Sequence, residues 1–200
     1  MDRTGRLANN YRIMRHGQSR ANEREIIVSS IATDQRGDFG LTALGQAQAL
    51  AAAHGSGLPA STLVFSSDFT RARQTAEIVR NCLGAAPAAT EPALRERYFG
   101  QLDGGPVSGY TRVWTADAAD AAHGACGAEP ADTVFARAAA LVAELERRYQ
   151  GRDILLVSHG DTLQILQAGL TGLGPARHRE VPHLEVAEIR RLALSAASAE

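Results

Sequence analysis

Four consecutive apolar residues, Ile154-Leu155-Leu156-Val157, constrain the fold of this chain more than any other feature. A run that is apolar on both faces is typical of a strand in the middle of a parallel sheet, where helices cover both sides. The run ends abruptly in Ser158-His159-Gly160. We therefore expect an interior parallel strand whose carboxyl end carries a histidine.

Other segments complete an alternating pattern of strands and helices. Three shorter stretches have the composition of strands, namely residues 11–14, 63–65 and 185–192. Four stretches carry apolar residues at helical spacing, and they begin near Thr42, Asp68, Asp132 and Asp161. Strands alternating with amphipathic helices favour an α/β fold, with a mostly parallel central sheet and helices on both faces.

For the first two of these helices, the sequence also predicts which residues cap them and which residues share a face. Thr42 is a candidate N-cap. Helical spacing places four residues of its helix on one face, namely Leu44, Ala47, either Leu50 or Ala51, and His54. Residues 66–68 are a candidate cap for the next helix, which puts Arg71 in its first turn.

Two stretches lack periodicity. Residues 18–40 are polar and loop-like, and residues 84–130 are rich in Gly, Pro and Ala, so we expect an irregular insertion at about 84–130. Long segments of this kind often carry function. Because no repeat or long linker interrupts the chain, we expect a single domain over residues 1–200.

Composition excludes several classes of function. The formal net charge is −1, so the chain lacks the basic field that nucleic acids or anionic membranes would favour. All 21 basic residues are arginine, which excludes lysine Schiff-base chemistry and a P-loop with its lysine. Cys82 and Cys126 form no paired motif, and no apolar run is long enough to span a bilayer, so we expect a cytoplasmic protein.

Two strands of the predicted sheet end in a histidine followed by glycine, at His16-Gly17 and at His159-Gly160. Because ligands of open parallel sheets bind outside the carboxyl ends of the strands, both imidazoles are expected to reach one spot. Arg15 and Arg71 lie at the same edge. Arginines, histidines and helix N-termini together suit a tetrahedral dianion, and phosphate is the obvious candidate.

These residues also lie in motifs that resemble those of the histidine phosphatase superfamily, which has the phosphoglycerate mutase-like fold. The resemblance begins at Arg15-His16-Gly17, with Ser19 and Asn22 downstream. It continues in order through the blocks at 41–45, 66–76, 94–100 and 158–160. Together the blocks span about residues 11 to 192, which is nearly the whole chain.

The resemblance implies a role for each residue of the motifs. His16 would be the nucleophile that becomes a phosphohistidine, and Glu96 would protonate the leaving oxygen and later activate water. The phosphate oxygens would be held by Arg15, Arg71 and His159, with help from Asn22. Neighbouring arginines favour the neutral imidazole that a nucleophile needs. The scheme requires no metal and no cofactor.

Several of these residues have a plain structural alternative. Glu96 lies between two arginines and can belong to a solvated charge run, and Asn22 can be a loop cap. His54 and His123 are expected to be structural or exposed, whereas His178 or His183 can line the mouth of the pocket. A zinc site is not expected, because the histidines lack metal-ligand spacing.

Departures from the family pattern bear on the reaction. Mutases of the family carry extra basic residues after the glutamate, whereas residues 104–127 supply only Arg112, so we expect hydrolysis. The predicted function is a phosphomonoester hydrolase that acts on a small phosphorylated metabolite. The alternatives are a cofactor-dependent phosphoglycerate mutase and a low-activity phosphate-binding regulatory protein. The physiological ester and the oligomeric state stay open.

Overall fold

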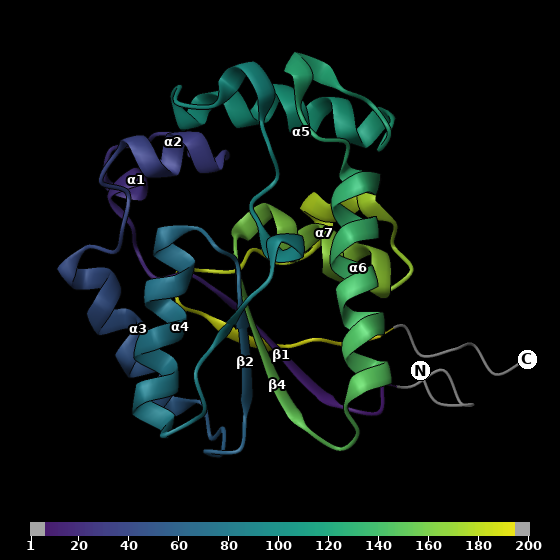
Figure 1. The fold of residues 1–200 in the computed structure, drawn as a ribbon. Helices are drawn as coiled ribbons and strands as arrows, with labels where there is room; N and C mark the ends of the chain where they lie inside the picture. The colour runs from purple at the N-terminus through teal and green to yellow at the C-terminus, as the bar shows by residue number, and fades with distance from the viewer. Residues whose placement is uncertain (1–6, 195–200) are drawn as a thin grey trace, which may run out of the picture.

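A five-stranded sheet runs through the middle of the computed structural model, which describes residues 7–194 (Figure 1). The strands are β1 (Asn10–Arg15), β2 (Leu63–Ser66), β3 (Ala89–Thr90), β4 (Asp153–Ser158) and β5 (Ile189–Arg191). Their order across the sheet is β3-β2-β4-β1-β5, and only β5 pairs in the antiparallel direction. The predicted α/β fold with a mostly parallel sheet is therefore confirmed.

β4 is the central strand, as its apolar run predicts. All four residues from Ile154 to Val157 are 0% exposed. β4 pairs with β1 on one side, where Ser158 lies opposite Arg15, and with β2 on the other, where Val157 lies opposite Ser66. The carboxyl ends of these three strands consequently meet at one edge of the sheet.

Helices cover both faces of the sheet (Figure 1). α3 (Ala43–Gly55) and α4 (Thr70–Leu83) pack on one face, mainly through alanines, whereas α6 (Ala131–Arg148) and α7 (Gly160–Leu170) pack on the other through leucines and valines. Three further helices lie beyond the carboxyl ends of β1 and β4, namely α1 (Arg20–Glu23), α2 (Ile31–Arg36) and α5 (Tyr110–Ala119). Within residues 7–194, no helix has the length and apolar character to cross a membrane.

The face that α3 buries differs from the one that its spacing predicts. Thr42 caps the helix as expected, because its hydroxyl accepts from the N–H of Gly45 at 3.0 Å. Leu44 and Leu50, however, are 54% and 44% exposed. The buried face consists of Gly45, Ala49 and Ala53. A Cβ on Gly45 would lie 2.0 Å from the carbonyl oxygen of Gln18, so close backbone approach selects the face with the smallest residues.

The predicted cap of α4 is also wrong. Phe69 is the N-cap residue and makes no side-chain cap hydrogen bond. Asp34, far away in the sequence, accepts from the N–H and the hydroxyl of Thr70 at 3.0 and 2.8 Å. A carboxylate at a helix N-terminus accepts from a free N–H and interacts favourably with the positive end of the helix dipole. A contact with a distant residue thus replaces the local cap. Arg71 nevertheless lies in the first turn, as predicted.

Three other stretches differ from expectation in how much regular structure they contain. The segment 84–130 includes α5 and several short 3-10 turns, so it is not irregular throughout, and residues 18–40 form α1 and α2. The last strand covers only 189–191 of the predicted 185–192. Ala187 has a φ of 61°, which interrupts an extended chain, and its N–H approaches the carbonyl oxygens of Arg15 and His16.

Candidate active site

The carboxyl ends of β1 and β4 bring two histidines together. The N–H of His16 donates to the carbonyl oxygen of Ser158 at 3.0 Å, which ties the end of β1 to the end of β4. The ring centroids of His16 and His159 are 5.2 Å apart, and both residues are buried. The structure thus places the two histidines at one edge of the sheet, as the sequence pattern predicts.

The hydrogen bonds of His16 assign its tautomer. Its Nδ1 lies 2.8 Å from the carbonyl oxygen of Gly17, which can only accept, so Nδ1 carries the proton. Nε2 then accepts from Nε of Arg71 at 3.0 Å. Burial lowers the pKa of His16 well below its ordinary value, and the charges of Arg71 and Arg15 lower this pKa further. The ring is therefore neutral, with its lone pair on Nε2.

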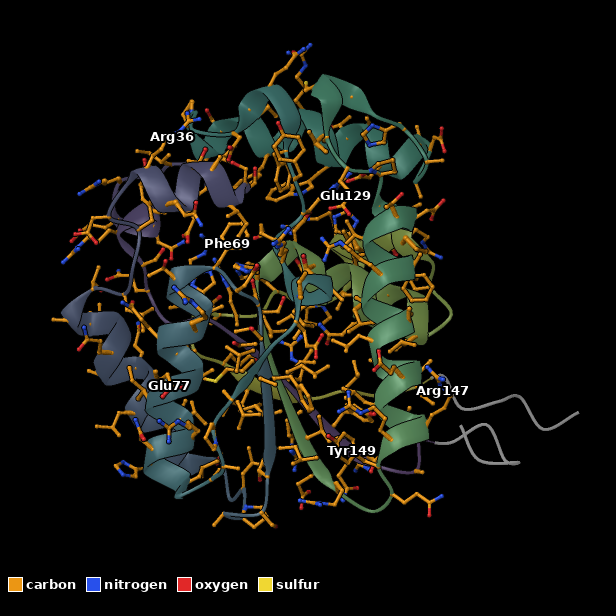
Figure 2. The ribbon with its side chains drawn as sticks, viewed as in Figure 1. Arg36, Phe69, Glu77, Glu129, Arg147 and Tyr149 are labelled. Atoms are coloured by element: carbon orange, nitrogen blue, oxygen red, sulfur yellow. The ribbon has the colours of Figure 1, made fainter. Side chains whose placement is uncertain are left out.

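Arg71 is held in place from several sides. Its Nη2 donates to the carbonyl oxygen of Val28 at 2.9 Å, and its Nη1 lies 3.8 Å from a carboxylate oxygen of Asp34. The guanidinium carbon lies 4.8 Å from the ring centroid of Phe69. Figure 2 shows Phe69 beside the N-terminal end of α4. The segment 18–40, which the sequence leaves as a loop, therefore positions the arginine of the site.

His159 is the N-cap residue of α7 and packs edge-on against Phe69, with ring centroids 5.1 Å apart. Its Nε2 lies 2.9 Å from the hydroxyl of Ser67. That hydroxyl accepts from the N–H of Phe69 and can still donate its own proton to Nε2, and in that arrangement Nδ1 of His159 carries the ring hydrogen. Burial, followed by the charge of Arg71, lowers the pKa of His159 well below its ordinary value.

Arg15 comes from the end of β1 and reaches toward the loop before β5. Its Nη1 donates to the carbonyl oxygen of Leu184 at 2.9 Å and lies 2.8 Å from Nε2 of His183. His183 therefore lies at the site. His178 does not take the same position, because it is completely buried behind the site and lies 3.4 Å from Asp161.

Three buried polar atoms of this cluster make no hydrogen bond within the described part of the chain. They are Nε of Arg15, Nη1 of Arg71 and Nδ1 of His159. Buried donors without partners are rare in folded proteins and call for an explanation. Donors from β1, α4 and the start of α7, two of them cationic, suit an oxyanion with several oxygens.

Glu96 follows the 3-10 turn at Pro92–Leu94 and is half-buried. One carboxylate oxygen accepts from the N–H of Arg97 at 3.0 Å and from the hydroxyl of Thr162 at 3.3 Å. Burial raises the pKa of Glu96 and the charge of Asp161 raises it further, against the opposing charges of Arg71 and Arg15. The Glu96 carboxyl therefore stays protonated to a higher pH than an exposed glutamate does. This environment differs from the solvated charge run that is the structural alternative for Glu96.

Asn22 belongs to the cap of α1. Its side-chain oxygen accepts from the N–H and the hydroxyl of Ser19, both at 2.9 Å, in a capping box. The predicted contact of Asn22 with phosphate stays a prediction. Within residues 7–194, no group of three or more His, Cys, Asp or Glu side chains is arranged to hold a metal ion.

A buried cluster of charges lies behind Glu96, and sequence reasoning did not identify it. Arg97 donates to both carboxylate oxygens of Asp117 at 2.6 and 2.8 Å, and both side chains are 0% exposed. Asp161 accepts from the indole of Trp114 at 2.8 Å, and His123 pairs with Asp117 at 2.7 Å. Asp117 and Trp114 of this cluster lie on α5, and the sequence of α5 has no apolar periodicity that would predict a helix there.

A cavity of about 480 Å³ lies beside Glu96. The charges in its wall are matched, because Arg95 pairs with Asp68 at 2.7 Å and Arg137 pairs with Glu129 at 2.8 Å. Glu129 lies close to the N-terminal end of α6 (Figure 2). The two arginines in the wall of this cavity are thus already paired with carboxylates.

The fold is a mostly parallel α/β sheet with helices on both faces, and its carboxyl edge gathers histidines and arginines of a kind that suits an oxyanion. The model of the histidine phosphatase superfamily (branch 1) matches residues 12–199. The chain therefore belongs to the histidine phosphatase superfamily, and it is a phosphatase of phosphomonoesters.

The relatives that the chain resembles include phosphatases and a probable mutase. The chain is 32% identical over 176 residues to glucosyl-3-phosphoglycerate phosphatase of Mycobacterium tuberculosis, which covers 80% of this chain and 74% of that protein. It is 31% identical to a probable phosphoglycerate mutase of Yersinia enterocolitica, over 84% of this chain and 78% of that protein. The solved structure of mycobacterial glucosyl-3-phosphoglycerate phosphatase with VO3 superposes with a TM-score of 0.76 at 29% identity, covering 92% of this chain and 90% of the other.

Proposed function

We propose that the chain hydrolyses a small phosphomonoester through a covalent intermediate on Nε2 of His16. The observation that carries the proposal is the hydrogen-bond pattern of this ring, with Nδ1–H fixed by Gly17 and the lone pair of Nε2 facing Arg71. A neutral imidazole is a competent nucleophile. The same cations that keep it neutral attract the dianionic phosphoryl group.

In the first step, a bond forms between Nε2 of His16 and phosphorus while the bond from phosphorus to the ester oxygen breaks. Arg15, Arg71 and His159 hold the three equatorial oxygens, and Asn22 assists through its amide N–H groups. Glu96 gives its proton to the departing oxygen. Charge stabilisation by fixed donors supplies most of the catalysis in phosphoryl transfer, and the positioned acid adds about 10²–10⁴-fold.

In the second step, the carboxylate of Glu96 takes a proton from water, and that water attacks phosphorus. The bond between phosphorus and nitrogen breaks, which releases inorganic phosphate and returns His16 to its neutral form. Every catalytic group in this scheme is a side chain of the protein, and the other reactants are the ester and water. The raised pKa of Glu96 supports its role, because the acid has to be protonated when substrate arrives.

Leaving-group dependence tests the division of roles. Glu96→Gln should lower kcat about 10²–10⁴-fold on an alkyl phosphate and much less on an aryl phosphate with an acidic phenol, which departs without a proton. Arg71→Ala should slow both esters alike, because the phosphoryl group needs its charge whatever leaves. Equal slowing of both esters by Glu96→Gln would place the proton donor elsewhere.

Trapping tests the covalent intermediate and separates the alternatives. Wild-type protein quenched during turnover should carry an acid-labile, base-stable phosphoramidate, and His16→Ala should carry none. Dependence of turnover on a bisphosphorylated primer would indicate a mutase. Binding of phosphate without turnover of any ester would indicate a regulatory protein.

The mycobacterial relatives suggest the first esters to test and the setting of the enzyme. Because those proteins are phosphatases of glucosyl-3-phosphoglycerate, phosphate esters of sugars and of hydroxy acids are the first candidates. We place the enzyme in the cytoplasm, where the two free thiols of Cys82 and Cys126 stay reduced.

A further inference from the structure

His178 is a buried histidine with a hydrogen-bond acceptor near each of its ring nitrogens. It belongs to the 3-10 turn at Pro175–Glu180, and its side chain is 0% exposed. Its Nδ1 lies 2.9 Å from the carbonyl oxygen of Pro175, which can only accept, so Nδ1 carries a proton. Its Nε2 makes no hydrogen bond within the described part of the chain, yet it lies 3.4 Å from Oδ1 of Asp161 and 3.8 Å from Oδ2 of Asp117. A lone pair on Nε2 would therefore face two carboxylates.

The two carboxylates are already engaged as acceptors. Both oxygens of Asp117 accept from Arg97 at 2.6 and 2.8 Å, and Oδ1 of Asp161 accepts from the indole of Trp114 at 2.8 Å. Burial raises the pKa of Asp161, but the hydrogen bond and charge of His178, together with the charge of Arg97, outweigh burial and hold this pKa below its ordinary value. Asp161 is thus ionised, and a proton between Asp161 and His178 belongs to the imidazole.

A second histidine at the same cluster has a different protonation state. Nδ1 of His123 accepts from the N–H of Ala125 at 2.8 Å, so this nitrogen holds a lone pair. Nε2 of His123 then donates to Oδ1 of Asp117 at 2.7 Å. His123 is therefore neutral, and it gives the cluster a hydrogen bond without a charge.

The buried charges balance only when His178 is a cation. α5, α6 and α7 pack against its turn, and within the described part of the chain only Asp117 of α5 and Asp161 of α7 bring a carboxylate within ion-pair distance of the ring. Arg97 supplies one buried positive charge against these two negative charges. Arg179, which also acts on Asp161, is exposed. Because an uncompensated charge in a dry interior is strongly disfavoured, the geometry favours an imidazolium.

We propose that His178 is a buried imidazolium and a positioning residue: it keeps Asp161 ionised and offsets part of its charge, so that Glu96 can act first as a proton donor and then as a base. This inference rests on the proposed phosphatase function. After burial, the charge of Asp161 is what raises the pKa of Glu96, and this suits the first step. The second step needs the carboxylate of Glu96, which an uncompensated Asp161 would return to the protonated form. The cation at His178 limits this effect.

Nuclear magnetic resonance of the resting protein provides the first test. In protein labelled with ¹⁵N, through-bond connections to the backbone assign each imidazole ring. His178 should carry a proton on both ring nitrogens at about pH 7.5, where an ordinary histidine is mostly neutral, whereas His123 should carry one, on Nε2. A single ring proton on His178 would overturn the inference. This measurement needs neither a variant nor turnover.

The pH dependence of the two steps provides the second test. In His178→Gln, Glu96 should keep its proton to higher pH, so the alkaline limb of kcat on an alkyl phosphate should move up by about 0.5–1 pH unit. This shift is smaller than the shift of about 1–3 units that a charge in direct contact causes. The acid limb for decay of the preformed phosphoenzyme should move up by the same amount, because water attack needs the carboxylate.

His123→Gln is the matched control, since it removes a neutral ring from the same cluster and should leave both limbs in place. A lower kcat for His178→Gln with both limbs unmoved would show a purely structural role and overturn the inference. Two ring protons on His178 in a protein that hydrolyses no ester would refute the proposed function and leave the buried cation standing.

Discussion

Asp117→Ala tests how strongly the buried cluster behind Glu96 holds the site together. Arg97 donates to both carboxylate oxygens of Asp117, and both side chains are completely buried. The backbone N–H of Arg97 also binds the carboxylate of Glu96, so a displaced Arg97 shifts the acid. We therefore expect a loss of stability together with a loss of activity on esters that need a proton donor.

The structure sets the size of the effect. Removing one partner of a buried, hydrogen-bonded ion pair costs about 3–5 kcal/mol. Asp161 stays 3.4 Å from Nη1 of Arg97 and keeps part of the attraction. The lower end of the range, about 3 kcal/mol, is therefore expected. In a chain of this size each kcal/mol lowers Tm by about 2–4 °C, which corresponds to a fall of about 6–12 °C.

Urea unfolding followed by circular dichroism measures the change in the free energy of unfolding. Glu180→Gln is the matched control, because the pair between Arg177 and Glu180 is exposed, and this variant should unfold like the wild type. The double variant Arg97→Met/Asp117→Ala should lose less stability than the two single variants combined, since neither member of the Arg97–Asp117 pair is left buried without the other. A loss below about 1 kcal/mol for Asp117→Ala would refute the reasoning, because exposed pairs contribute that little.

Four further outcomes are expected. Because burial lowers the pKa values of His16 and His159, the unfolded chain binds more protons than the folded chain below pH 6.5. The free energy of unfolding should therefore fall as the pH drops through 6.5, by up to about 1.4 kcal/mol per pH unit for each histidine. Urea unfolding of the wild type and of His159→Gln at several pH values measures this slope. Asp161→Asn should lower the pKa of Glu96 and move the alkaline limb of kcat for an alkyl phosphate to lower pH, with the aryl profile unmoved. Asp34→Asn should raise KM and lower kcat on alkyl and aryl phosphates alike, because Arg71, which donates to His16, loses its carboxylate neighbour. Activity should survive EDTA and be inhibited by vanadate; loss on chelation with recovery on adding zinc or magnesium would contradict the proposed phosphate clamp.

Sequence reasoning identified the parts of this site that local patterns encode. An apolar run followed by His159-Gly160 marks the end of a buried strand, and a parallel sheet aligns that end with His16 without any further information. Arg71 follows from the position of a helix after a strand. In each case the position of a residue relative to its own element is sufficient.

The partners of these residues depend on contacts between distant segments, and no local pattern reports them. Asp34 lies 36 positions before the N–H that it caps, and Trp114 lies 47 positions before the carboxylate that it binds. The prediction of the buried face of α3 was wrong for a related reason. The close approach of the Gln18 backbone to Gly45 outweighs the burial of Leu44. Hydrophobic spacing predicts what an isolated helix would bury and carries no information on how closely a neighbour approaches.

The proposed roles require opposite protonation biases within one pocket. His16 has to be neutral to attack, and Arg15 and Arg71 favour that state by lowering its pKa. The same two cations favour the ionised form of Glu96, which as a proton donor has to be protonated. Burial disfavours the charged form of both groups, because it lowers the pKa of an imidazole and raises that of a carboxyl. The negative charge of Asp161 then adds to burial at Glu96, whereas the arginines add to burial at His16. Both groups are therefore shifted toward their uncharged forms, although the same arginines oppose that shift at Glu96.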